Sequence, residues 1–377
     1  MKVNPQYNSK EKLLSLYNKP LLELVYEAAT IHREYHNPRE VQMSSLISIK
    51  TGGCSEDCGY CPQAARYHTG VDAEGLMNVG MVIERARNAK KNGSSRLCMG
   101  AAWREVKNNR DFDNVIQMVQ QVNSMGMEVC CTLGMLTEDQ AKRLKNAGLY
   151  AYNHNLDSSE EYYADVISTR EYNDRLNTIE NVRDAGISVC SGGIIGMGEK
   201  VEDRIGLLMS YMKMDTPPES IPINALVAVE GTPLEDQKEI ESWEIIRMVA
   251  TTRIAFPESI VRLSAGRTSL SMETQGMCFM AGAGSIFAGD KLLTTPNPEF
   301  NEDSEMFNIL GLIPKKPFQD GAQPASNKDE IIEKKKALAE KRKKELQAAK
   351  ENTIKLKFKP RVIKTVDSIL NEKQLSK

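Results

Sequence analysis

The chain has 377 residues, of which 41% are apolar and 27% are charged, and its net charge is -2. This composition allows a sizeable buried core and excludes a chain that is disordered throughout. The first residues are polar and lack the apolar stretch of a secretory signal. No later apolar run reaches the roughly 18 residues of a membrane span. We therefore expect a cytoplasmic protein with no membrane partner.

Charge is unevenly distributed along the chain. Residues 326–377 contain 16 Lys and Arg against 8 Asp and Glu, whereas the rest contains 33 against 43. Prolines and glycines precede this basic stretch. The predicted parts are an N-terminal helical segment at 1–40, a main domain at 41–313, a linker at 314–326 and a charged helical or disordered tail at 327–377. Glutamates are interspersed in the tail and aromatic residues are rare, so we predict no nucleic-acid partner.

In chain order, a leucine-rich segment from Glu11 to Tyr35 predicts one N-terminal helix. Short apolar runs after it alternate with longer amphipathic stretches. The runs predict strands at Leu46–Lys50, Arg96–Gly100, Glu128–Leu133, Ala151–Asn155, Ser188–Cys190, Pro222–Val227, Ile260–Ser264 and Ser285–Phe287. The stretches predict helices at Val79–Asn92, Phe112–Met125, Thr137–Asn146, Asp174–Ala185, Glu202–Met214, Ile240–Ala255 and Leu270–Ala281. Thr137 and Gln140 fit a capping box at one helix start.

Strands that alternate with helices indicate a parallel sheet. At this chain length, the pattern favours closure into an α/β barrel of the (β/α)8, TIM type. An open doubly wound sheet is the alternative. In a barrel of this type the active site lies at the carboxyl ends of the strands.

Three cysteines directly follow the first predicted strand. Cys54, Cys58 and Cys61 have the spacing C-x3-C-x2-C in a glycine-containing loop. Groups of thiolates suit iron–sulfur clusters and soft metals. A four-iron cluster held by three cysteines keeps one iron open for a small molecule, as catalytic metal sites keep one position free. A structural zinc ion completed by His68 is the alternative, although no second C-x2-C pair is present.

This motif resembles that of the radical S-adenosylmethionine (SAM) superfamily, which has an aromatic residue, here Tyr60, before the last cysteine. The resemblance implies a [4Fe–4S] cluster that binds SAM at its open iron. One electron cleaves SAM, and the 5′-deoxyadenosyl radical takes a hydrogen atom from the substrate. It also implies an electron donor such as flavodoxin or ferredoxin.

The remaining cysteines are dispersed along the chain. Cys98, Cys130 and Cys190 lie in three different predicted strands, and inward positions of successive barrel strands converge on one interior volume. Each one alone is more simply a buried small side chain, but together they favour a second metal centre. Cys131 is expected to face away from Cys130 because neighbours alternate along a strand, although a register shift of one would exchange them. Cys278 lies on a helical pattern and is expected in the core.

Several longer segments resemble the biotin synthase family of radical SAM enzymes. They are Tyr-Cys-Pro-Gln at 60–63, Tyr-Asn-His-Asn-Leu-Asp at 152–157, Cys-Ser-Gly-Gly at 190–193, Val-Arg-Leu-Ser-Ala-Gly-Arg at 261–267 and Met-Cys-Phe-Met-Ala-Gly-Ala at 277–283. The resemblance covers residues 13–312. It implies a [2Fe–2S] cluster deep in the barrel, held by Cys98, Cys130, Cys190 and Arg262. From the residues alone, Arg262 is a counter-charge for an anionic cluster, because a guanidinium stays protonated.

The same resemblance implies contacts to SAM and to the substrate dethiobiotin. It places Asn155 and Asp157 at the SAM ribose and the substrate, and Arg175 near the SAM carboxylate. It makes Asn224 the contact to the ureido ring of dethiobiotin. From the residues alone, Asn153, Asn155 and Asp157 share one strand face or form an Asn/Asp-capped turn, and Arg175 is a helix-surface charge.

A glycine-rich stretch, residues 192–199, follows the fifth predicted strand. Glycines there allow a ligand to approach the backbone closely, although such a stretch is also typical of a simple turn. The resemblance implies that Gly193 and Ile194 pack against SAM, as Tyr60 does.

The resemblance implies a sulfurtransferase that inserts sulfur into dethiobiotin to form biotin, with the [2Fe–2S] cluster as sulfur donor, in a homodimer. Radical chemistry suits this substrate because its saturated carbons are not acidic enough for a protein base. The alternatives are another radical SAM barrel enzyme with an auxiliary cluster, such as a hydrogenase-maturation enzyme, and a non-catalytic metal-binding protein.

Overall fold

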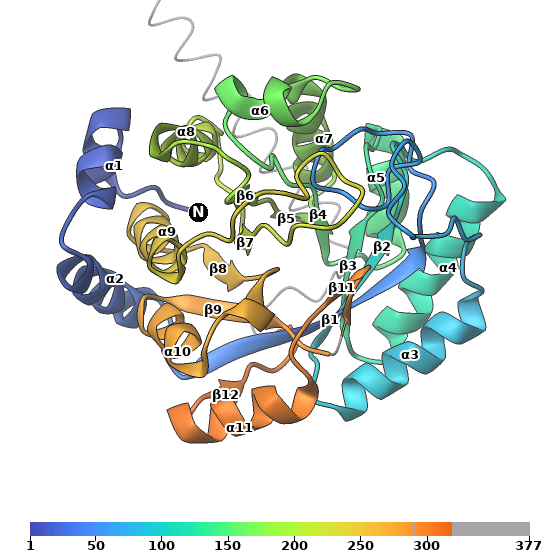
Figure 1. Ribbon diagram of the computed structural model, residues 1–377. Helices are drawn as coiled ribbons and strands as arrows, with labels where there is room; N and C mark the ends of the chain where they lie inside the picture. Colours follow the sequence, from blue (N-terminus) through green and yellow to red (C-terminus); the bar gives the residue numbers. More distant parts are fainter. Residues whose placement is uncertain (290, 319–377) are drawn as a thin grey trace, which may run out of the picture. The chain divides into compact units, whose positions relative to one another are not determined.

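The computed structural model describes residues 1–289 and 291–318, and its centre is a closed parallel sheet surrounded by helices (Figure 1). The strands are β1 (Glu40–Lys50), β2 (Arg96–Ala101), β3 (Glu128–Thr132), β4 (Ala151–Asn153), β5 (Ser188–Cys190), β6 (Gly193–Ile195), β7 (Ser220–Ala225), β8 (Ile260–Leu263), β9 (Ala283–Phe287), β10 (Lys291–Leu292), β11 (Thr295–Pro296) and β12 (Ile313–Pro314). The tail predicted at 327–377 lies outside the described residues.

The sheet closes on itself, which confirms the predicted TIM-type barrel. Its strands follow the order β1-β2-β3-β4-β5-β7-β8-β9, every neighbouring pair is parallel, and β9 pairs back onto β1. β6 continues the line of β5 beside β7. An open doubly wound sheet has two unpaired edges, so the β1–β9 pairing excludes that alternative.

Helices cover the outer face of the barrel. They are α1 (Lys10–Tyr17), α2 (Leu21–Tyr35), α3 (Val79–Lys91), α4 (Arg110–Ser124), α5 (Glu138–Asn146), α6 (Glu160–Val166), α7 (Tyr172–Asp184), α8 (Val201–Met212), α9 (Ser242–Ala255), α10 (Met272–Met280) and α11 (Phe300–Leu310). Short 3-10 turns form at Pro5–Tyr7 and Arg267–Ser269. The capping box predicted at Thr137 and Gln140 is present at the start of α5.

The single N-terminal helix predicted from Glu11 to Tyr35 is wrong. It is two helices, α1 and α2, separated by residues 18–20. Pro20 is the reason, because a proline disfavours helical geometry at the residue before it and its ring suits the start of a new helix.

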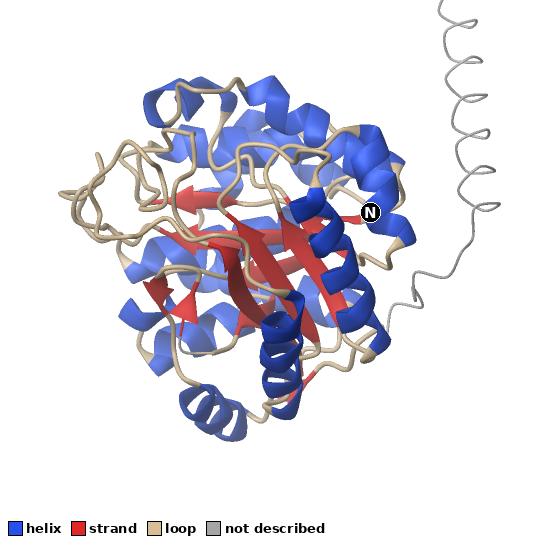
Figure 2. Cartoon of the chain, turned by 90° about the vertical axis from the view of Figure 1, so that its right-hand side faces the viewer, coloured by secondary structure: helices blue, strands red, loops and turns tan. Residues whose placement is uncertain are grey.

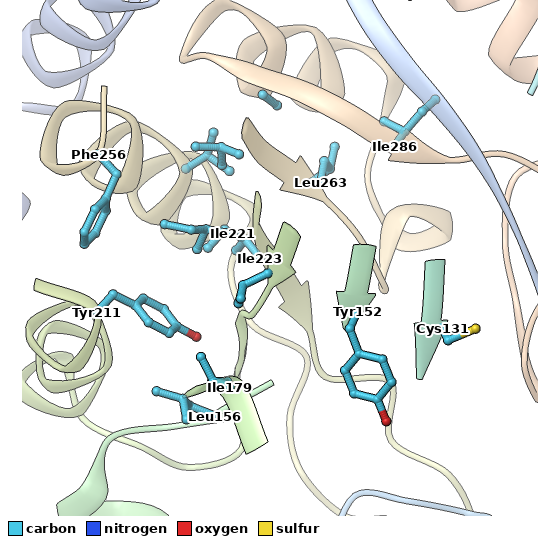
Figure 3. Close-up of a cluster of buried hydrophobic side chains, with 14 of the residues drawn as sticks. Cys131, Tyr152, Leu156, Ile179, Tyr211, Ile221, Ile223, Phe256, Leu263 and Ile286 are labelled. Carbon is cyan, nitrogen blue, oxygen red and sulfur yellow. The ribbon is translucent and has the colours of Figure 1, made fainter. Parts of the chain in front are cut away.

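The buried side chains form two separate groups. The larger group fills the space between the sheet and the helices, and Figure 3 draws part of it. The smaller group lies inside the barrel and contains Cys98, Cys130, Ala151, Phe287 and Leu292. Connecting loops gather at one end of the strands (Figure 2), which is the end where the first cysteine motif follows β1.

The chain returns to the barrel after α11. β12 pairs in parallel with the start of β1, and the amide N of Phe318 donates to Glu128 Oε1 at 2.8 Å. The first residues of the interval predicted as a linker therefore contact the barrel. No helix in the described part of the chain has the length and apolarity needed to cross a bilayer.

Candidate active site

The cysteine loop curls back on itself directly after β1. Cys54 N donates to Gln63 O at 2.9 Å, and Ala65 N donates to Cys54 O at 2.7 Å. Gly52 has φ of +65°, and a Cβ on it would lie 2.5 Å from Asp72 O, so only glycine fits this turn. The three cysteines Cys54, Cys58 and Cys61 all line one cavity, which we call the cysteine-loop pocket.

The described residues do not assemble a complete site for one zinc ion. Among residues 1–289 and 291–318, no three His, Cys, Asp or Glu side chains lie close enough to hold a single metal ion. Zinc needs four donors within about 2.3 Å of one point, and His68 does not line the cysteine-loop pocket. In an iron–sulfur cluster the thiolates bind separate irons, so they stand further apart.

Asparagine and aspartate side chains form the opposite wall. Asn153, Asn155 and Asp157 all line the cysteine-loop pocket. β4 ends at Asn153 rather than at the predicted Asn155, and Asp157 has a left-handed φ of 68°. The prediction of one strand face is therefore wrong for Asn155 and Asp157, which lie after the strand, as the alternative of a turn had it. Asn155 Oδ1 accepts from Gly192 N at 3.1 Å, and Asp157 O accepts from Ile194 N at 2.8 Å.

Arg175 is a buried cation of this pocket, not a surface charge. Its side chain is 4% exposed and forms an ion pair with Asp157, and its Nε donates to Tyr163 Oη at 2.7 Å. Tyr60 Oη donates to the same Asp157 carboxylate at 2.7 Å. Tyr60, Asp157 and Arg175 therefore form one connected polar group beside the cysteines.

A second cavity, the barrel pocket, continues from the first into the barrel interior. The two share Tyr60, Cys61, Asn153, Asn155 and Asp157 in their walls. Further in, the barrel pocket is lined by Cys98, Cys130 and Arg262. The space therefore runs from the cysteine loop to the dispersed cysteines.

Two of the three dispersed cysteines, Cys98 and Cys130, line the barrel pocket, whereas Cys190 is buried but does not line it. Cys98 and Cys130 are register partners on β2 and β3. A hydrogen bond from the Cys130 thiol lowers the pKa of Cys98 to about 7, with the positive charges of Arg262 and Arg96 adding to the effect. Burial raises the pKa of Cys190, and Arg262 opposes that rise. The pKa of Cys130 is raised by the same thiol pair and by burial.

Arg262 lies near these thiols, and its hydrogen-bond partners among the described residues, Ser285, Gln42 and Ser44, are all uncharged. It is 1% exposed. Its Nε donates to Ser285 Oγ at 3.0 Å, and its NH2 lies 3.3 Å from Gln42 Oε1. Its guanidinium also stands 4.7 Å from the Phe287 ring centroid. No carboxylate in the described residues forms an ion pair with it, so the cation suits an anionic partner in the barrel pocket.

Cys131 and Cys278 take no part in either pocket. Both belong to the group of side chains between sheet and helices, where Figure 3 draws Cys131 near Tyr152. The register shift that would have exchanged Cys130 and Cys131 is therefore excluded.

The glycine-rich stretch holds a strand that the sequence did not predict. Gly193–Ile195 forms β6, and Ile194 lines the barrel pocket. Asn224 on β7 also lines it; its Nδ2 donates to Gly193 O at 2.9 Å and its Oδ1 accepts from Ala265 N at 3.2 Å. Its amide keeps one N–H and one lone pair for a ligand.

Two residues of the cysteine-loop pocket were missed in the sequence. His154 and Arg170 line this pocket. His154 Nε2 and Arg170 Nε are buried and have no hydrogen-bond partner among the described residues. Buried polar atoms are normally paired, so these two fit a polar ligand. His154 follows the predicted Asn153 directly, but no local pattern distinguishes Arg170.

Comparisons with known proteins agree with this site. Residues 48–210 match the radical SAM superfamily, and residues 222–313 match the biotin and thiamin synthesis associated domain. The biotin synthase of Flavobacterium johnsoniae is 64% identical over 325 residues, which cover 86% of this chain and 90% of that protein. The chain belongs to the biotin synthase family. Another family member, the mitochondrial biotin synthase of Arabidopsis thaliana, is 57% identical over 86% of each chain.

More distant solved structures share only the fold with this member of the biotin synthase family. Methylornithine synthase has a TM-score of 0.70 and 17% identity, covering 83% of this chain and 95% of that chain. A maturase of the [FeFe]-hydrogenase also has a TM-score of 0.70 and 17% identity, covering 81% and 72%. Membership of the biotin synthase family and of the radical SAM superfamily implies an iron–sulfur cluster that works with SAM.

Proposed function

We propose that this chain is a sulfurtransferase that inserts sulfur into dethiobiotin to form biotin. One observation carries the proposal: Cys54, Cys58 and Cys61 line one pocket, and Cys98 and Cys130 line a second pocket that shares part of its wall with the first. The identity of 64% to a biotin synthase supports the choice of substrate.

In this proposal Cys54, Cys58 and Cys61 hold a [4Fe–4S] cluster. When bound, this cluster supplies the electron that cleaves SAM into methionine and a radical able to take hydrogen from a saturated carbon. The residues around it hold SAM in place: Tyr60, Asn155, Asp157, Arg175, Gly193 and Ile194. The buried Arg175 keeps its charge through Asp157, and its position in the pocket wall suits a carboxylate.

The inner set acts as the sulfur source. Cys98, Cys130, Cys190 and Arg262 hold a [2Fe–2S] cluster, which is a substrate because it gives up a sulfide. Asn155 and Asn224 orient dethiobiotin between SAM and this cluster. Holding the reacting atoms in line inside a closed cavity is the main contribution of the barrel. Flavodoxin or ferredoxin as donor, the homodimer and the cytoplasmic location stay predictions.

The test is an anaerobic assay of the reconstituted protein with dethiobiotin, SAM and a reductant, in which biotin is measured by mass spectrometry. We expect biotin from the wild type and none from Cys58→Ala, which lacks one ligand of the first cluster. Protein that carries the iron and sulfide of both clusters yet makes no biotin would refute the assignment. SAM cleavage without biotin would instead indicate a radical SAM enzyme with another substrate.

A further inference from the structure

The residues between Cys54 and Cys58 bind a distant turn of the chain. Asp57 Oδ1 accepts hydrogen bonds from Ser168 N at 2.9 Å and from Thr169 N at 3.1 Å. Glu56 accepts from the Thr169 hydroxyl. Both carboxylates are nearly fully buried, at 8% and 3% exposure. Burying charges is costly unless they are paired, so these contacts fix residues 168–170 against the cysteine loop.

This turn presents the guanidinium of Arg170 to one of the cysteines. The side chain of Arg170 is 8% exposed, and its NH2 lies 4.0 Å from Cys58 Sγ. Its Nε stands 3.8 Å from Glu56 Oε2 and has no hydrogen-bond partner among the described residues. Arg170 and Cys58 line the same cysteine-loop pocket.

Glu56 does not depend on Arg170 alone. Arg104 NH1 lies 3.2 Å from Glu56 Oε1, and the same NH1 donates to Thr169 O at 2.6 Å. Arg104 therefore supports the same carboxylate and the same turn, but it does not line the cysteine-loop pocket. Substituting the two arginines one at a time therefore distinguishes support of the turn from positive charge near Cys58, which Arg170 provides and Arg104 does not.

A cation beside a cluster thiolate makes the cluster easier to reduce. Reduction by one electron makes the cluster and its ligands more negative, and a nearby positive charge in a poorly solvated pocket stabilises that state. Hydrogen bonds to the sulfurs act in the same direction. Arg175 lines the same pocket as Cys58, and each arginine has part of its charge offset by a carboxylate, Arg175 by Asp157 and Arg170 by Glu56.

We propose that Arg170 is a positioning residue that raises the reduction potential of the cluster held by Cys54, Cys58 and Cys61. The proposal rests on the proposed function, because it assumes a cluster at these cysteines. Glu56 and Asp57 set the distance between Arg170 and Cys58. Glu56 and Asp57 thereby have a role beyond spacing Cys54 from Cys58.

The test is an anaerobic redox titration of the reconstituted holoenzyme, followed by the EPR signal of the reduced cluster, without SAM. Arg170→Met should shift the equilibrium for reduction at least tenfold towards the oxidised form, a fall of about 59 mV for one electron. Arg170→Lys keeps the charge and should shift it less. Arg104→Met is the matched control and should leave the potential unchanged.

Two results would overturn the proposal: an unchanged potential in Arg170→Met, or an equal shift in Arg104→Met, which would mean that only support of the turn matters. If Arg170→Met does not retain iron, Arg170→Gln should show the same fall, and its absence would also overturn the proposal. Failure of the wild type to make biotin would refute the proposed function alone, because the titration needs only the cluster. Wild type without any cluster would contradict both.

Discussion

Cys130 and Cys131 are neighbours on β3, and a shift of one residue in the strand register would change which of the two thiols faces the barrel interior. Cys130 belongs to the group of side chains inside the barrel and Cys131 to the group outside it. The alternation of side chains along a strand predicts this difference, but sequence alone left the register open. Only the pairing of Cys98 with Cys130 across β2 and β3 decides which thiol faces the cavity.

We predict opposite results for the two alanine variants. Cys130→Ala should lose the inner cluster, because it removes a ligand from the barrel pocket. Cys131→Ala should keep that cluster and lose about 1 kcal/mol of unfolding free energy, a usual cost of a small core substitution. Iron and sulfide content and visible absorption of anaerobically purified protein measure the first effect, and urea unfolding measures the second. Loss of the inner cluster in Cys131→Ala alone would contradict the assignment.

Residues whose partners lie far away in the sequence could not be predicted from the sequence alone. Cys54, Cys58 and Cys61 are recognised because their spacing is local. Arg170 is not, because Cys58 lies 112 positions away and the contact depends on how the turn at 168–170 meets the cysteine loop.

At the scale of elements, the segment between β5 and β6 supports Asn155 and Asp157 in the wall of the cysteine-loop pocket, which we call the polar wall. A Cβ on Gly192 would lie 2.0 Å from Pro222 O, so this segment approaches β7 more closely than any other residue type allows. The same glycine binds the polar wall on both sides: its N–H donates to Asn155 Oδ1 and its carbonyl accepts from Asp157 N.

Gly192→Ala should therefore push β7 and the polar wall apart. We expect it to lower the unfolding free energy by about 1–3 kcal/mol, the usual range for overpacking, and to weaken SAM binding. Gly75→Ala is the control, because a Cβ there meets nothing within 4 Å. Thermal unfolding and equilibrium dialysis with SAM measure the two effects. Equal behaviour of the two variants would show that the close approach is not needed.

The elements themselves were largely predictable, and the failures have physical causes. Each predicted strand is present, because buried parallel strands read as short apolar runs. Pro20 divided a helix that the leucine pattern alone made continuous. β6 was read only as a glycine-rich turn, because glycine is a poor strand former, and pairing with β7 overrides that preference.

At the scale of the whole molecule, closure of the sheet is what brings the site together. Alternating strands and helices predict a parallel sheet, and the chain length favours its closure, but only the pairing of β9 with β1 establishes that the sheet closes. Closure turns the inward positions of β2, β3 and β8 towards one space, so that Cys98, Cys130 and Arg262 line the same pocket.

The far end of the barrel is contacted by the segment that follows α11, which we call the strap (residues 313–318). Lys315 N donates to Val41 O at 2.9 Å, and the Phe318 ring meets the Tyr150 ring edge-on with centroids 6.0 Å apart. The strap also binds Glu128, which forms a buried ion pair with Arg96 at 2.6 Å. These contacts lie next to Cys130 along β3 and Cys98 along β2.

Two truncations should therefore behave differently. Ending the chain after Gln323 keeps the strap and removes mainly the basic stretch, so we expect an unchanged melting temperature and both clusters. Ending it after Leu312 removes the strap and leaves the Glu128 carboxylate short of one donor, which costs about 1–3 kcal/mol and opens the barrel end nearest the inner cysteines. That variant should melt earlier and lose inner-cluster iron faster under a chelator. Equal chelation rates in the two truncations would show that the strap does not protect the inner site.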